Sequence, residues 1–224
     1  MVLASTLPLG AADCEIAGGG LLAQPSNAWS SLTYVVVGIV LIASISRAPR
    51  SDRPLRVAFG ALMAATGIGS VLYHGPQPAI AGFAHDITFL AVLWFLILMN
   101  PASPYGVPRR SAWTALALVT VAASIILIAS PNATNLITGV SVVGLIMSDI
   151  LIQRIGGVNG RWYAAALLLL AASLVFNLLG RSGAVTCDPD SLIQLHALWH
   201  GLSASALGAY YVATTVPRNE EPSP

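Results

Sequence analysis

The chain has 224 residues, of which 56% are hydrophobic and only 8% are charged, and its formal net charge is +1. Soluble domains carry about 25% charged residues, so the composition excludes a water-soluble globular protein and predicts a membrane protein. The near-neutral charge gives no indication of a nucleic-acid partner. Every basic residue is arginine, and the absence of lysine excludes a retinal Schiff base, which requires a lysine amine.

Seven apolar segments follow one another along the chain, each close to the roughly 20 residues that a transmembrane helix needs. Short loops rich in Pro, Gly and Asn separate them. We therefore predict an all-α membrane protein: a seven-transmembrane helix bundle over residues 25–216, after an N-terminal segment (1–24) and before a polar tail (217–224). The expected spans are 25–46, 55–74, 79–100, 111–130, 132–153, 161–179 and 191–216.

The arginines predict how the bundle is oriented. They gather between the first and second spans, before the fourth, between the fifth and sixth, and in the tail, whereas only Arg181 falls on the opposite side. Arginine-rich loops stay in the cytoplasm, so we expect the N-terminus outside and the C-terminus inside. The exclusive use of arginine with abundant alanine is typical of a GC-rich bacterial genome, which favours a multi-pass protein of a bacterial plasma membrane.

The only two cysteines, Cys14 and Cys187, both fall in short polar segments on the expected outer side. Disulfides persist outside the cytoplasm. We predict a bond that ties the N-terminal segment to the loop before the last span. Two unpaired thiols are the alternative.

Ionisable residues gather at one expected depth of the membrane. His74 ends the second span, Asp86 lies near the start of the third, and His196 and His200 begin the seventh. Because alternate spans run in opposite directions, all four lie in the outer part of the bundle. Ionisable side chains are costly there and mark functional sites.

The spacing of these residues suits a metal centre. His196 and His200 are four residues apart and project from one helical face, as two ligands of one metal do, and His74 can supply a third. Three histidines and a water are a usual catalytic zinc arrangement. Asp86 is then the expected general base, and Ser70, one turn before His74, a hydrogen-bond donor to the oxyanion.

Plainer interpretations exist for each residue alone. A helical serine such as Ser70 more often bonds its own i−4 carbonyl, and a single histidine near a helix end is more often an interfacial polar group than a ligand. His85 points about 100° away from Asp86 on a helix, so we favour an interfacial or second-shell role for it over ligation. A non-enzymatic receptor with a structural zinc, and a transporter with a histidine proton relay, are the competing functions. Inverted repeats or broken helices would favour a transporter, and the sequence shows neither.

The joint pattern resembles the alkaline ceramidase family, within the superfamily that includes progestin and adipoQ receptors. That superfamily is marked by Ser-x3-His in the second core helix, Asp in the third and His-x3-His in the seventh. The likeness extends from residue 14 to about residue 211. The matching positions are Ser70, His74, Asp86, His196 and His200, with further likeness at Cys14-Glu15, at residues 27–31 and at residues 194–200.

The resemblance implies a zinc-dependent intramembrane amidase that hydrolyses ceramide to a sphingoid base and a fatty acid, with a lipid amide taken from the bilayer. It also implies that Cys14 and Cys187 form the family's lumenal disulfide. An outer N-terminus favours the ceramidases over the receptors, whose resemblance implies an inner one. Animal members bind calcium with an acidic N-terminal cluster, of which Asp13 and Glu15 remain. Calcium takes about six to eight oxygen ligands, so two carboxylates disfavour a calcium site.

Overall fold

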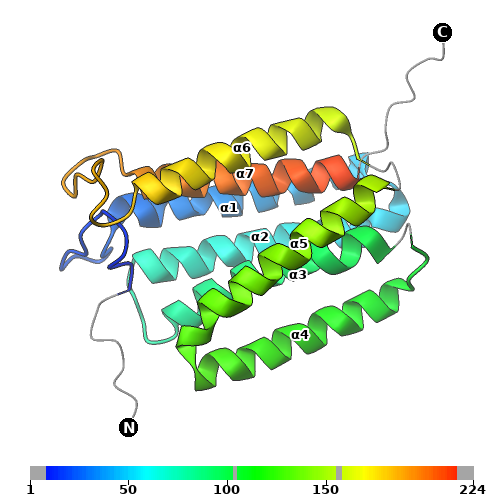
Figure 1. Ribbon diagram of the computed structural model, residues 1–224, viewed down its shortest axis with the longest axis horizontal. Coiled ribbons are helices and arrows are strands. Elements are labelled where there is room, and N and C mark those ends of the chain that lie inside the picture. Colours follow the sequence, from blue (N-terminus) through cyan, green and yellow to red (C-terminus); the bar gives the residue numbers. More distant parts are fainter. Residues whose placement is uncertain (1–8, 103–104, 155–157, 216–224) are drawn as a thin grey trace.

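The computed structural model describes residues 9–102, 105–154 and 158–215, and these ranges are almost entirely helical (Figure 1). Six helices among the described residues are long and apolar enough to cross a membrane, and they correspond to six of the seven expected spans. Histidine, serine and threonine side chains make the seventh less apolar. The seven helices are α1 (Pro25–Ala43), α2 (Arg53–His74), α3 (Ala81–Ala102), α4 (Arg109–Ala129), α5 (Thr134–Arg154), α6 (Gly160–Leu179) and α7 (Leu195–Thr215).

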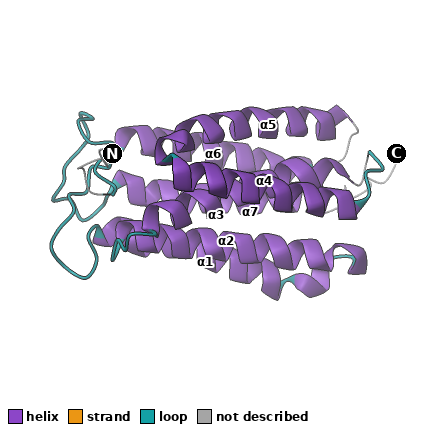
Figure 2. Ribbon diagram, turned by 90° about the horizontal axis from the view of Figure 1, so that it is seen from below, coloured by secondary structure: helices purple, strands orange, loops and turns teal. Residues whose placement is uncertain are grey.

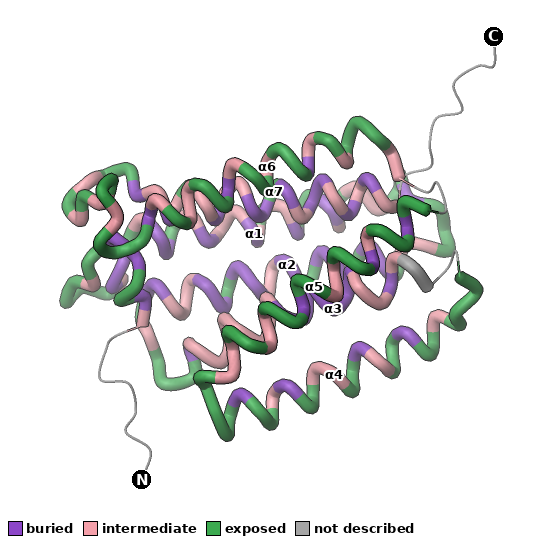
Figure 3. The backbone as a smooth tube through the Cα atoms, viewed as in Figure 1, coloured by how far each residue is buried: buried purple, intermediate pink, exposed green. Residues whose placement is uncertain are grey.

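The helices pack mainly against their neighbours in the chain, and α7 closes the arrangement by packing against α1 and α6. α3 lies against α2, α4 and α5. Phe59 of α2 stacks on Tyr211 of α7 with ring centroids 4.4 Å apart and meets Phe95 of α3 at 5.4 Å. Buried residues concentrate on α1, α2, α3 and α7, whereas α4, α5 and α6 are more exposed (Figure 3). Many of the exposed residues on these three helices are large and apolar. Such surface suits contact with lipid chains.

The last helix begins later than the sequence suggests, at Leu195 rather than at residue 191. Gln194 accounts for the difference, because its Nε2 donates to the carbonyls of Asp188, Pro189 and Ser191. These bonds hold the preceding residues in a turn, so the helix begins directly before His196. Residue 216 and the predicted tail lie outside the described residues.

The segment 9–24, hereafter the N-terminal strap, lies at the same end of the bundle as the loop between α6 and α7 (Figure 2). The predicted disulfide is present, with the sulfur atoms of Cys14 and Cys187 2.07 Å apart. Cys14 N also donates to Gly180 O at 2.8 Å, and Ser182 N to Ala12 O at 2.9 Å. The strap is therefore joined to this loop by one covalent bond and a short backbone bridge.

Candidate metal centre

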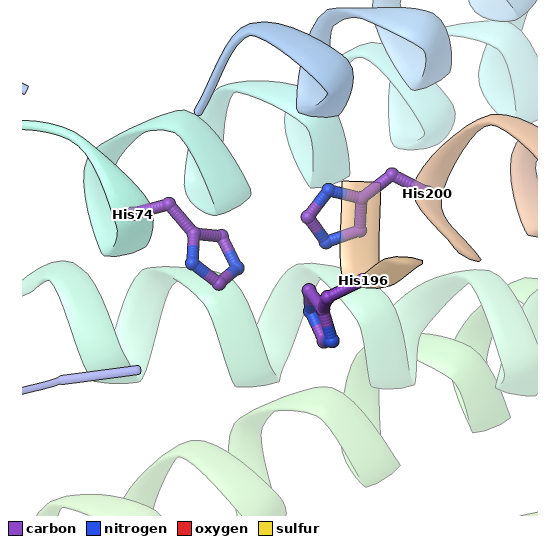
Figure 4. Close-up of side chains that lie close together, drawn as sticks. All are labelled: His74, His196 and His200. Atoms are coloured by element: carbon purple, nitrogen blue, oxygen red, sulfur yellow. The ribbon is translucent and has the colours of Figure 1, made fainter. Parts of the chain in front are cut away.

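Three histidines meet at the end of the bundle that the strap covers. His74 is the last residue of α2, and His196 and His200 lie in the first two turns of α7. One ligand nitrogen from each lies within 4.8 Å of the others (Figure 4). All three side chains are buried. The predicted grouping is confirmed: these imidazoles are close enough to bind one metal ion.

Glycine at the end of α6 allows this meeting. A Cβ at Gly180 would collide with the backbone nitrogen of His196. The chain therefore turns from α6 toward α7 with the two backbones in contact. That contact fixes the position of the first ligand on α7.

The ring of His74 is held by Gln24, the last residue of the strap. His74 Nδ1 lies 2.6 Å from Gln24 Oε1. Gln24 Nε2 donates to the carbonyls of Gly10, at 3.0 Å, and Glu15, at 2.5 Å. Since the amide nitrogen already faces two acceptors, Oε1 is the atom that faces the ring. Nδ1 of His74 must then carry the hydrogen, which leaves the Nε2 lone pair free for a metal.

The same reasoning fixes the tautomer of His200. Its Nδ1 lies 2.9 Å from Ser30 Oγ and 3.4 Å from Ser31 Oγ. Both hydroxyls donate their single hydrogen to the carbonyl of Asn27, at 3.0 and 2.7 Å. Each can therefore only accept from the ring. Nδ1 of His200 is the donor, and Nε2 is again free.

Behind His196 stands a carboxylate of the strap. Asp13 Oδ1 lies 3.2 Å from His196 Nδ1, although the angle falls outside hydrogen-bond geometry, and Asp13 Oδ2 lies 3.9 Å from His74 Nδ1. Burial raises the pKa of Asp13 to about 6, an effect that the Arg181 guanidinium opposes. Ligating histidines commonly have such a carboxylate or carbonyl on the far ring nitrogen, where it sets the tautomer and orientation. The three imidazoles, two of them oriented by hydrogen bonds, are a ligand set of the kind that zinc takes in proteins.

A cavity of about 1060 Å³ opens onto the three histidines. Asp86, His85 and Ser70 also line it. Asp86 does not belong to the three-histidine group. Its Oδ1 accepts from His85 Nδ1 at 2.9 Å, and its Oδ2 accepts from Thr134 Oγ1 at 2.6 Å. The predicted base thus faces the same cavity as the predicted ligands, and His85 holds it in place.

The Ser70 hydroxyl bonds Ser31, one of the two serines at His200, rather than a carbonyl of its own helix. Its Oγ is 2.8 Å from Ser31 Oγ. Because the Ser31 hydrogen goes to Asn27 O, Ser70 is the donor of this bond. The Ser70 hydroxyl must therefore rotate before it can donate into the cavity.

The two acidic residues of the strap have separate protein partners. Glu15 accepts from the backbone nitrogens of Ser26 at 2.8 Å and Asn27 at 2.9 Å. It satisfies N–H groups at the start of α1 that have no partner within the helix. Asp13 faces the histidines instead. Glu15 therefore caps the start of α1, whereas Asp13 lies next to the histidines.

Sequence reasoning did not find the residues that orient the ligands. Gln24, Ser30 and Ser31 are neutral polar residues at a helix start, where capping is the ordinary expectation. One signal was available: Gln24, Asn27 and Ser31 recur at intervals of three and four, and all three are fully buried. A polar stripe on the buried face of an apolar helix indicates a partner inside the bundle.

Comparison with protein-family models and with curated proteins finds no match to this chain.

Proposed function

We propose that the protein is a zinc-dependent membrane amidase that hydrolyses the N-acyl bond of ceramide-like lipids to a sphingoid base and a fatty acid. One observation carries the proposal. Three buried histidines, two with a free Nε2 fixed by their hydrogen bonds, meet a large cavity that also contains a carboxylate. A structural metal would instead have its fourth position closed by the protein.

In this proposal α7 is a seventh span, because it packs along α1 and α6, which are themselves apolar enough to cross. The arginine-rich loops then lie in the cytoplasm. The strap, the disulfide and the histidines lie on the outer side. The lipid amide enters from the outer leaflet of a plasma membrane.

His74, His196 and His200 would hold the ion. A zinc ion held by three histidines lowers the pKa of a water toward 7 and polarises a carbonyl group. Asp86 accepts the proton of the attacking water and delivers it to the departing amine, so that one water is consumed and one acid and one amine are formed. His85 and Thr134 keep both oxygens of Asp86 oriented. Ser70 turns from Ser31 to donate to the amide oxygen as negative charge develops there.

The shape of the cavity suits a lipid. Its apolar lining includes Phe83, Phe89, Leu127 and Ile128. Toward the centre of the bundle it reaches Thr66, two turns before His74 on α2. An amide placed at the histidines therefore has apolar space for its acyl chain.

Mass spectrometry of lipids after incubation with the purified protein tests the proposal. We expect cleavage of N-acyl sphingoid lipids that a chelator abolishes and zinc restores, with little cleavage of short soluble amides or of ester lipids. The double variant His196→Ala/His200→Ala should lose both zinc and turnover. Ser205→Ala, an exposed position on the same helix, is the matched control. If the wild-type protein holds zinc and cleaves no lipid amide, the proposal is wrong, and a receptor of the progestin and adipoQ type with a structural zinc is favoured.

A further inference from the structure

Arg181 is placed beside the metal centre by the backbone. It pairs with Asp13 in an antiparallel bridge, flanked by the hydrogen bonds from Cys14 N to Gly180 O and from Ser182 N to Ala12 O. In this pattern Asp13 and Arg181 form a non-hydrogen-bonded pair, whose side chains leave the bridge on the same face and lie close together. Asp13 points at His74 and His196. The side chain of Arg181 therefore extends toward the same site, and it lines the cavity.

The guanidinium of Arg181 has no hydrogen-bond or ion-pair partner among the residues that the structure describes. Asp13, its neighbour across the bridge, lies within ion-pair distance of the two histidines but not of Arg181. Arg181 is also exposed, whereas Asp13 is buried. Five N–H donors in a planar fork are thus available at the open end of the cavity.

Further amide donors line the same cavity. Asn132 and Asn135, near the start of α5, and Asn177, at the end of α6, line the same cavity. None of their side chains has a hydrogen-bond partner within the described ranges. We call Arg181 and these three asparagines the amide–arginine rim. Arg181 gives it one positive charge, and the Asp13 carboxylate, its neighbour across the bridge, also lines the cavity.

The rim lies at one end of the cavity, and Thr66 and Tyr34 lie at the other, with the histidines between them. A lipid whose amide carbon sits at the histidines and whose acyl chain fills the inner part must place its head group at the rim. A guanidinium fork binds carboxylate, phosphate and sulfonate oxygens in paired hydrogen bonds. A neutral hydroxyl head group cannot form these paired, charge-assisted bonds.

We propose that Arg181 recognises an anionic head group, so that the preferred substrates are lipid amides carrying a carboxylate, phosphate or sulfonate near the amide. This inference rests on the amidase function proposed above, and it narrows the substrate class of that site. Asn132, Asn135 and Asn177 supply additional donors to the same oxyanion.

The test compares kcat/KM for ceramide, ceramide 1-phosphate and an N-acyl serine with identical acyl chains. The readout is the ratio of the anionic to the neutral substrate. Wild-type protein should favour the anionic lipids. Arg181→Gln should lower the ratio about twofold to fivefold, the range for one charged pair at an exposed position. Arg181→Glu should lower it further. Arg110→Gln removes an exposed arginine at the opposite end and should leave the ratio unchanged.

Direct binding of ceramide 1-phosphate to the purified protein separates this inference from the amidase proposal. Weaker binding by Arg181→Gln than by wild type supports the inference even if no amide is cleaved. Cleavage of all three lipids with a ratio that Arg181→Gln does not change would overturn it. The inference is also overturned if Arg181→Gln leaves the anionic-to-neutral ratio unchanged and weakens inhibition by free fatty acid, because Arg181 would then bind the carboxylate product.

Discussion

Replacing Gln24 with leucine should weaken metal binding although all three histidines are retained. The change keeps the side-chain volume nearly constant in a fully buried position but removes three hydrogen bonds: to Gly10 O, to Glu15 O and from His74 Nδ1. The ring of His74 then loses the acceptor that fixes its tautomer. Loss of such a partner typically lowers metal affinity about 10-fold to 100-fold, equivalent to about 1.4–2.8 kcal/mol.

Gln77→Leu is the matched control. Gln77 Nε2 donates to two backbone carbonyls, Leu9 O at 2.9 Å and Tyr73 O at 3.0 Å, and one of these belongs to the strap. Both variants lose about 1 kcal/mol for each bond to a carbonyl. Only Gln24→Leu also leaves a buried histidine donor unsatisfied, at a cost of about 1–3 kcal/mol. The two should therefore differ in zinc affinity as well as in stability.

Competition with a chromophoric chelator in detergent micelles measures the affinity, and elemental analysis measures the occupancy. We expect Gln77→Leu to bind zinc like the wild-type protein and Gln24→Leu to bind it more weakly. Wild-type affinity in Gln24→Leu, or an equal loss in both variants, would show that the hydrogen bond to His74 does not hold the ligand.

Three further predictions concern the base, the second ligand partner and the strap. Asp86→Asn should retain zinc but lose about 10²–10⁴-fold in turnover, because the amide cannot accept a proton. Elemental analysis measures the zinc and steady-state kinetics the turnover, and wild-type turnover would remove Asp86 from the mechanism. Ser30→Ala should lower zinc affinity more than Ser205→Ala, since Ser30 is the nearer of the two serines that accept from His200, whereas Ser205 bonds only Gly201 O of its own helix; equal affinities would remove Ser30 from the site. Cys14→Ser/Cys187→Ser should lower the thermal midpoint, and the lost loop entropy sets an upper bound of about a few kcal/mol on the loss in unfolding free energy. The same variant should weaken zinc binding, because Asp13 is then held less firmly. Unchanged zinc affinity at full occupancy would show that the backbone bridge alone holds the strap.

The helices and the three-histidine cluster were predictable because both depend on local or strongly constrained features. Apolar runs of membrane-spanning length form helices almost regardless of their neighbours, and few positions in such runs tolerate a histidine. The start of α7 was placed too early because the Gln194 side chain bonds carbonyls of the residues just before it and holds them in a turn. Amphipathic periodicity does not report such a turn.

The partners of the ligands were not predictable for a different reason. Asp13 lies in a segment without periodicity. Its contact with His196 depends on a disulfide between residues 173 positions apart and on the backbone bridge from Asp13 to Arg181. Gln24 precedes a proline at the start of α1, which is a common position for an unremarkable capping residue. The partners of Gln24 and Asp13 become evident only once the strap is placed against the bundle in the structure.

This placement of the strap has a consequence for how the protein matures. The bundle contributes three imidazoles, but two of the groups behind them, Gln24 and Asp13, arrive with the strap. In a newly inserted chain whose strap is not yet oxidised and docked, His74 and His196 lack these partners, whereas His200 keeps Ser30 and Ser31 of α1. For the proposed zinc centre, the two histidines that face the strap are therefore expected to reach their final orientation only after the disulfide has formed.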